Sequence, residues 1–174
     1  KNLESLTMKV FSVFVFISLV QFGHAYPKQV NLGASFAHDP YVIGGSPAAP
    51  GEFPHQLALH TTTNPSNLRC GAVLISATEA LTASHCVEGS SPSGLYITAG
   101  LYLRDDPVYG QTRQLSNIIM HSDYCGSCDG FPNDIAILSW DDPIDFNEPD
   151  VGAARLPDNN ENDLAGDTCT ISGW

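Results

Sequence analysis

Basic residues are scarce in this sequence: Lys and Arg supply seven of its 174 residues against 19 Asp and Glu, giving a formal net charge of −12. Proteins that bind nucleic acid neutralise phosphates with clustered Lys and Arg, so no nucleic-acid partner is expected. Nine of the acids fall between Asp141 and Asp167. A block of like charge favours a solvated connection over a binding site.

Long apolar runs are equally scarce, and the single one lies near the N-terminus. Residues 10–20 are almost wholly apolar, follow Met8-Lys9, and precede small residues at Gly23 and Ala25. A membrane span needs about 20 residues, whereas a basic start, a short apolar stretch and a small-residue site are typical of a secretory signal. We expect a secreted, extracellular protein cleaved near Ala25, with no membrane association afterwards. Residues 1–25 then comprise upstream residues and the signal, with Met8 as the natural start.

The rest of the sequence is rich in turn residues, with 15 Gly and 12 Pro, and has no helix-length amphipathic period. Short apolar runs separated by turn signals predict strands. The predicted strands are residues 55–60, 70–76, 80–83, 95–101, 115–121 and 135–140. This spacing indicates an all-β fold, either a closed barrel or a sandwich.

Two segments carry candidate chemistry. The first runs from Cys70-Gly71 to Leu81-Thr82-Ala83-Ser84-His85-Cys86, and the second is Asn133-Asp134 followed by four apolar residues, 49 positions after His85. An imidazole can take and return a proton near neutral pH. A carboxylate can hold that imidazole in one tautomer.

Together with Val42-Ile43-Gly44-Gly45 and residues 169–174, these segments resemble the chymotrypsin/trypsin-like serine protease family. The resemblance implies a chymotrypsin-like double β-barrel, with His85 as general base and acid and Asp134 orienting it. It implies a propeptide at residues 26–41, a first barrel at 42–150, and a connection with the first strand of the second barrel at 151–174.

The resemblance also implies activation by cleavage after Tyr41, which frees the α-amino group of Val42. The family usually has Arg or Lys at the position of Tyr41. Either an activating enzyme that prefers aromatic residues is expected, or the precursor is not activated by that route. Expected partners are protein or peptide substrates and protease inhibitors.

The family's nucleophile motif, Gly-Asp-Ser-Gly-Gly, is absent from the 174 residues. We therefore expect a fragment that lacks the C-terminal half and the nucleophile and is itself inactive. One alternative is a non-catalytic protease homologue that acts as a binding module. A second concern is folding, because one barrel alone would expose the apolar face meant for its partner.

Five Cys leave an odd one in an exported protein. By resemblance Cys70 pairs with Cys86, and Cys169 pairs with a residue of the missing half. Cys125 and Cys128 have no place in the family pattern, and a small-loop disulfide, two free thiols, or a redox or metal pair all remain open. No cofactor and no metal are expected, since Ala99-Gly100 continues without a carboxylate where some relatives bind Ca²⁺.

Overall fold

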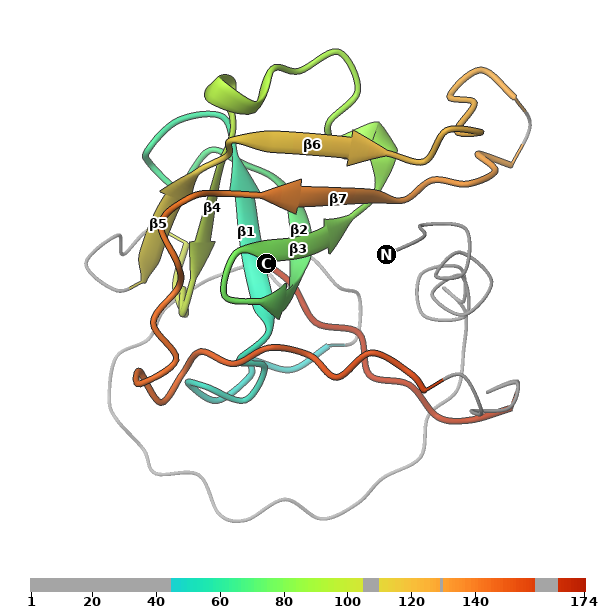
Figure 1. The fold of residues 1–174 in the computed structure, drawn as a ribbon. Coiled ribbons are helices and arrows are strands. Elements are labelled where there is room, and N and C mark those ends of the chain that lie inside the picture. Colours follow the sequence, from blue (N-terminus) through green and yellow to red (C-terminus); the bar gives the residue numbers. More distant parts are fainter. Residues whose placement is uncertain (1–44, 105–109, 129, 159–165) are drawn as a thin grey trace.

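The computed structural model describes residues 45–104, 110–128, 130–158 and 166–174. The described residues form one antiparallel sheet in the order β5-β4-β1-β2-β3-β7-β6 (Figure 1). Its strands are β1 (Gln56–His60), β2 (Leu68–Ser76), β3 (Glu79–Thr82), β4 (Tyr96–Ala99), β5 (Gln111–Gln114), β6 (Asn117–Met120) and β7 (Ala136–Ser139). Two short 3₁₀ helices, η1 (Ser84–Cys86) and η2 (Pro92–Gly94), complete the regular structure of this part of the chain. The all-β prediction is confirmed.

The sheet curls into a partial barrel because its two edge strands are neighbours along the chain. Only Leu115 and Ser116 separate β5 from β6. The backbone N–H of Leu115 donates to Leu95 O (3.0 Å), beside β4, and that of Ser116 donates to Ser139 O (2.8 Å) on β7. The chain thus passes from one edge of the sheet to the other within two residues, which a flat seven-stranded sheet could not allow.

Arg113 on β5 strengthens this closure. Its guanidinium donates to the backbone oxygens of Asp142 (2.8 Å) and Pro143 (2.9 Å), in the loop that follows β7. It also forms an ion pair with the Asp142 carboxylate at 2.8 Å. The Arg113 side chain therefore holds β5, at one edge of the sheet, against the loop that follows β7, the strand next to the other edge.

The apolar core fills the inside of the curl. Leu57 and Leu59 of β1 and Ile97 and Ala99 of β4 belong to one buried cluster, since alternate positions of a strand point to the same face. The largest fully buried apolar side chains are Leu57, Leu59, Leu74, Leu95, Ile97, Leu138 and Val87. Trp140 closes one end and donates its indole N–H to Ala77 O at 3.0 Å. Among the described residues every buried side-chain N or O atom has a hydrogen-bond partner.

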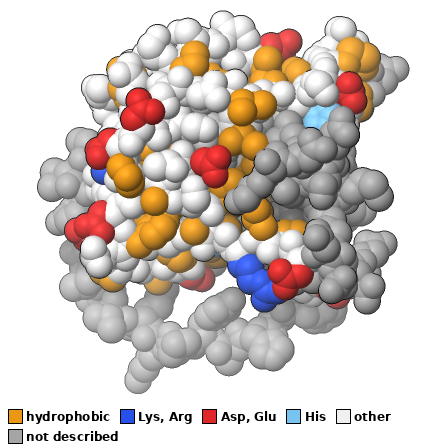
Figure 2. Space-filling view, in the orientation of Figure 1, with side chains coloured by type: hydrophobic (Ala, Val, Ile, Leu, Met, Phe, Trp, Pro, Cys, Tyr) orange, Lys and Arg blue, Asp and Glu red, His pale blue; other side chains and the backbone are white. Residues whose placement is uncertain are grey.

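The last described segment runs outside the sheet (Figure 1, red). Ser172 Oγ lies 2.8 Å from Gln56 Oε1, and the indole N–H of Trp174 donates to Tyr102 O at 3.1 Å. No strand is assigned in residues 166–174, and the expected first strand of a second barrel stays a prediction. Acidic side chains are more numerous than basic ones on the face drawn in Figure 2. No helix in the described ranges has the length and apolarity to cross a membrane.

Candidate active site

His85 lies at the centre of η1, directly after β3. The helix is tied down by backbone N–H donation from Cys86 to Ala83 O (3.1 Å) and from Val87 to Ser84 O (3.0 Å). A disulfide joins Cys86 to Cys70 on β2. The flanking Ser84 and Cys86 are buried while His85 is exposed. Because Ser84 and Cys86 are buried on either side of it, the His85 imidazole is held at the surface on a fixed piece of backbone.

Asp134 lies just before β7, at the end of a backbone turn. Asn133 has a φ of +58°, a left-handed conformation that Asn tolerates better than most residues. The Asn133 side-chain amide donates to Asp123 O at 3.0 Å, and the N–H of Ile135 donates back to Asn133 O at 2.8 Å. The turn directs the Asp134 carboxylate toward η1 instead of along the strand.

The structure brings His85 and Asp134 together by two direct hydrogen bonds. His85 Nδ1 lies 2.6 Å from Asp134 Oδ2, and the backbone N–H of His85 donates to Asp134 Oδ1 at 2.8 Å. The side chains are 55% and 19% exposed, respectively. Because both carboxylate oxygens are occupied by one residue, the acid is fixed in orientation as well as in distance.

A buried hydrogen bond joins the same two segments on the core side of the His85–Asp134 pair. Ser84 Oγ donates to Ile135 O at 2.7 Å, and that carbonyl also accepts the backbone N–H of His121 at 3.0 Å. The residues next to His85 and Asp134 are thus linked independently of the pair itself. Nothing in the sequence pattern singled out Ser84 for this contact.

The geometry determines the tautomer of the imidazole. A carboxylate can only accept, so Nδ1 carries the hydrogen and Nε2 of the neutral ring keeps its lone pair. Nε2 lies 3.4 Å from Cys86 Sγ, but a disulfide sulfur has no hydrogen to donate. A half-exposed imidazole whose Nε2 keeps its lone pair, and whose Nδ1 is held by an oriented carboxylate, is the arrangement of a general base.

Cys70, His85 and Cys86 place three potential metal-ligand atoms within 4.8 Å of one another, among the described residues. Thiolate is the ligand form of cysteine, and both sulfurs are joined in a disulfide. The cluster therefore offers one imidazole nitrogen and no thiolate. The expectation of no metal stays a prediction.

The other residues that the sequence singled out are three cysteines and the expected activation site. A second disulfide joins Cys125 and Cys128, so of the alternatives left open the structure has the small-loop disulfide. Cys169 is a free, exposed thiol. Tyr41 and Val42 lie outside the described residues.

Comparisons with known proteins place the chain among serine proteases by sequence. Residues 42–174 match the sequence profile of the family described as Trypsin. The chain is 44% identical over 133 residues to "Fibrinolytic enzyme, isozyme C" of Lumbricus rubellus, covering 76% of this chain and 54% of the relative. It is 29% identical over 163 residues to "Trypsin zeta" of Drosophila melanogaster (91% and 57%) and 39% over 117 residues to "Chymotrypsin-like serine proteinase" of Haliotis rufescens (65% and 45%).

The chain spans about half the length of these relatives. The profile match covers most of the 174 residues and includes the segments of both His85 and Asp134. Matched segments, curled antiparallel sheet and relatives together show that the chain belongs to the trypsin family of serine proteases.

Proposed function

We propose that this chain is the N-terminal part of a secreted serine endopeptidase precursor whose catalytic triad includes His85 and Asp134. The observation that carries the proposal is the imidazole with Nδ1 engaged by Asp134 Oδ2 at 2.6 Å and Nε2 free to accept a proton. A solvated surface ion pair would not need both carboxylate oxygens on one residue.

In the proposed reaction His85 Nε2 takes the proton of a serine hydroxyl as its Oγ attacks the peptide carbonyl. The imidazolium is stabilised by Asp134 and returns the proton to the leaving amine, which departs and leaves an acyl-enzyme. Water then attacks the ester with the same base, and the acid product leaves. Substrates are proteins or peptides, and protease inhibitors are the expected further partners.

The nucleophile belongs to sequence other than these 174 residues. Gly-Asp-Ser-Gly-Gly does not occur in them, and the matched relatives are about twice as long as the part of them aligned here. By resemblance to the family, the oxyanion-hole donors and the specificity pocket are expected in the same part of the protein as that serine. The 174 residues alone are expected to hydrolyse nothing by this mechanism.

Secretion and activation form the second part of the proposal. The apolar residues 10–20, followed by Gly23 and Ala25, support export. Val42-Ile43-Gly44-Gly45 after Tyr41 supports activation by cleavage between Tyr41 and Val42.

The test begins with the complete coding sequence and the secreted precursor made from it. Separate treatment with trypsin and chymotrypsin, followed by N-terminal sequencing, should release Val42 with chymotrypsin. Rapid release by trypsin would contradict the proposed activation. The activated protein should then react with a fluorophosphonate probe at one serine, and His85→Ala should abolish the labelling. No labelling of the activated protein, or a replaced serine in the complete sequence, would instead favour a non-catalytic homologue that acts by binding.

A further inference from the structure

The loop before Asp134 folds back onto the segment that follows His85. The Tyr124 hydroxyl donates to Glu88 Oε2 at 3.3 Å, across 36 positions of sequence. Glu88 is three residues after His85, and its backbone N–H donates to Ser84 O at 2.9 Å. This contact is separate from the His85–Asp134 hydrogen bonds and joins the same two parts of the chain.

Gly126 fits closely against this contact. A Cβ added to Gly126 would lie 2.9 Å from Tyr124 Oη and 3.0 and 3.1 Å from the two Glu88 carboxylate oxygens. Gly126 is not among the glycines with positive φ. The three close atoms are the ends of the Tyr124 and Glu88 side chains, so a methyl group at position 126 would displace these ends and open their contact.

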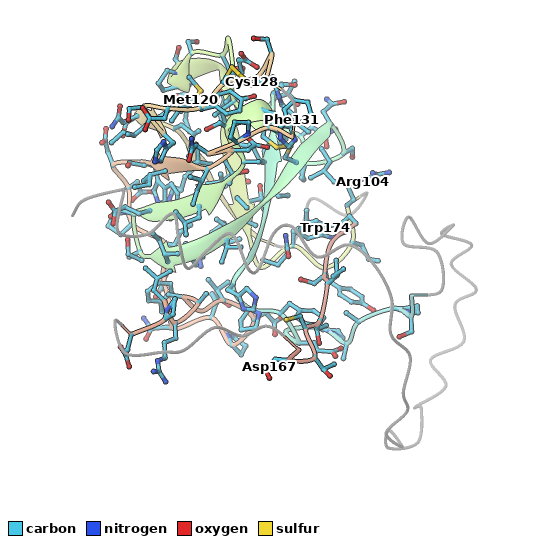
Figure 3. All side chains as sticks on the ribbon, turned by 90° about the vertical axis from the view of Figure 1, so that its right-hand side faces the viewer. Arg104, Met120, Cys128, Phe131, Asp167 and Trp174 are labelled. Atoms are coloured by element: carbon cyan, nitrogen blue, oxygen red, sulfur yellow. A yellow bond between two sulfur atoms is a disulfide. The ribbon has the colours of Figure 1, made fainter. Side chains whose placement is uncertain are left out.

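The Cys125–Cys128 disulfide keeps Gly126 in that place. The two cysteines flank Gly126 and Ser127, and the backbone N–H of Cys128 donates to Cys125 O at 3.2 Å. The ring is thus closed both covalently and by hydrogen bonding. Cys128 lies with Phe131 at one end of the molecule, far from Asp167 (Figure 3).

The loop also connects back to the acid. Tyr124 donates its backbone N–H to His121 O at 3.0 Å, and Asp123 O accepts the side-chain amide of Asn133, the residue before Asp134. Partial burial and the negative charges of Glu88 and Asp134 raise the pKa of Tyr124. Its hydroxyl thus stays protonated in the field of both carboxylates and remains a donor.

We propose that Tyr124 and Glu88 are positioning residues for the His85–Asp134 pair, and that the Cys125–Cys128 disulfide holds their contact closed. Two side-chain contacts then join the two segments: His85 to Asp134, and Glu88, after η1, to Tyr124 in the loop before Asp134. Opening the Glu88–Tyr124 contact removes one link between the two segments. The β3–β7 pairing, the Ser84 bond and the exposed His85–Asp134 contact itself remain. The inference rests on the proposed endopeptidase function.

The test uses the complete protein and two readouts. One is the solvent exchange of the His85 Nδ1–H proton, whose NMR resonance a short bond to a carboxylate shifts far downfield; it needs no nucleophile. The other is kcat with a peptide substrate. Tyr124→Phe and Glu88→Ala should each speed the exchange and lower kcat by about threefold to tenfold, the range of one lost hydrogen bond, with KM little changed.

Conservative and matched variants separate positioning from general damage. Glu88→Gln keeps an acceptor for the Tyr124 hydroxyl and should behave like the unmodified protein. Gly126→Ala should reproduce Tyr124→Phe. Gly94→Ala, where an added Cβ meets only Ser91 Oγ at 3.5 Å, should leave both readouts unchanged.

Replacing Cys125 and Cys128 together by Ser should also reproduce the effect of Tyr124→Phe. Unchanged proton exchange in Tyr124→Phe and Glu88→Ala would overturn the inference, as would equal losses in Glu88→Gln and Glu88→Ala. If the complete protein had no nucleophile, the exchange readout would still decide the inference while the proposed function failed.

Discussion

Replacing Asp134 by Asn keeps the shape of the side chain and turns one hydrogen-bond acceptor into a donor. The backbone N–H of His85 cannot change, so the amide oxygen must stay at the Oδ1 position, 2.8 Å from that nitrogen. The amide NH₂ then takes the Oδ2 position and faces His85 Nδ1, now at 2.6 Å. Since an amide nitrogen only donates, Nδ1 must become an acceptor, and the ring hydrogen moves to Nε2.

An imidazole with its hydrogen on Nε2 cannot act as the base at that atom. A positioned general base contributes about 10²- to 10⁴-fold to rate, so Asp134→Asn should lower kcat of the activated protein by that factor with little change in KM. The assay is steady-state hydrolysis of a peptide substrate at neutral pH. The ¹⁵N shifts of His85 should report the change of tautomer directly.

Asp123→Asn is the matched control. Asp123 is an exposed acid in the same loop, and its backbone groups, not its carboxylate, make the hydrogen bonds to Asn133 and His121. This variant should change kcat by less than about twofold. A loss of less than tenfold in Asp134→Asn, or an unprotonated Nε2 in its ¹⁵N spectrum, would refute the tautomer argument.

Three predictions concern stability, measured by urea unfolding of the complete protein in an Asp134→Asn background that does not digest itself. Burial lowers the pKa of His60 from 6.5, against a smaller opposing effect of its bond to Thr62 O. As the pH falls, the unfolded chain therefore takes up the proton before the folded protein does, and the free energy of unfolding decreases below about pH 6.5. His60→Gln should flatten that part of the stability profile, and an unchanged slope would contradict this. Ser84→Ala, which removes the buried bond to Ile135 O, should cost about 1 kcal/mol. Thr82→Val, which removes the partly buried bond to Gly71 O, should cost about the same. A cost below about 0.3 kcal/mol in Ser84→Ala would argue against the Ser84–Ile135 bond as a link between the two segments. Removing the Cys70–Cys86 disulfide, which spans 16 positions, should cost about 3 kcal/mol through the entropy of the unfolded chain, more than removing the shorter second disulfide, which spans three; equal costs would contradict that account.

The sequence predicted the apolar strands well and missed the polar one. All six predicted strands overlap observed strands, the clearest case being residues 55–60 against β1 (Gln56–His60). β5 (Gln111–Gln114) has no apolar residue and was not expected. It forms because its backbone pairs with β4 from Tyr96 to Ala99, and because Thr112 Oγ1 reaches Thr98 Oγ1 at 2.8 Å. An edge strand held by its ladder and by polar contacts has no apolar period to detect.

In the candidate site, too, the sequence predicted the residues that lie in motifs and missed the contacts between distant segments. His85 and Asp134 lie in short motifs whose residue types are tied to their chemistry, so local sequence was enough to select them. The Ser84–Ile135 contact joins residues 51 positions apart, and Glu88–Tyr124 joins residues 36 positions apart. Neither has a residue pattern of its own, because each depends on how β3 and β7 pair. Such contacts become visible only when the register of the sheet is known.

His85 and Asp134 are brought together by segments of this one barrel. β3 and β7 pair from Glu79↔Ser139 to Thr82↔Ala136, so the chain leaves β3 toward His85 at the point where it enters β7 from Asp134. The Ser84 bond and the Cys70–Cys86 disulfide then hold η1 on that edge. Because the tautomer of His85 follows from atoms within these segments, it needs no group from elsewhere. In the proposed reaction a nucleophile must add a hydroxyl within reach of Nε2, while the strand pairing, the Ser84 bond and the Glu88–Tyr124 contact orient the imidazole before it arrives.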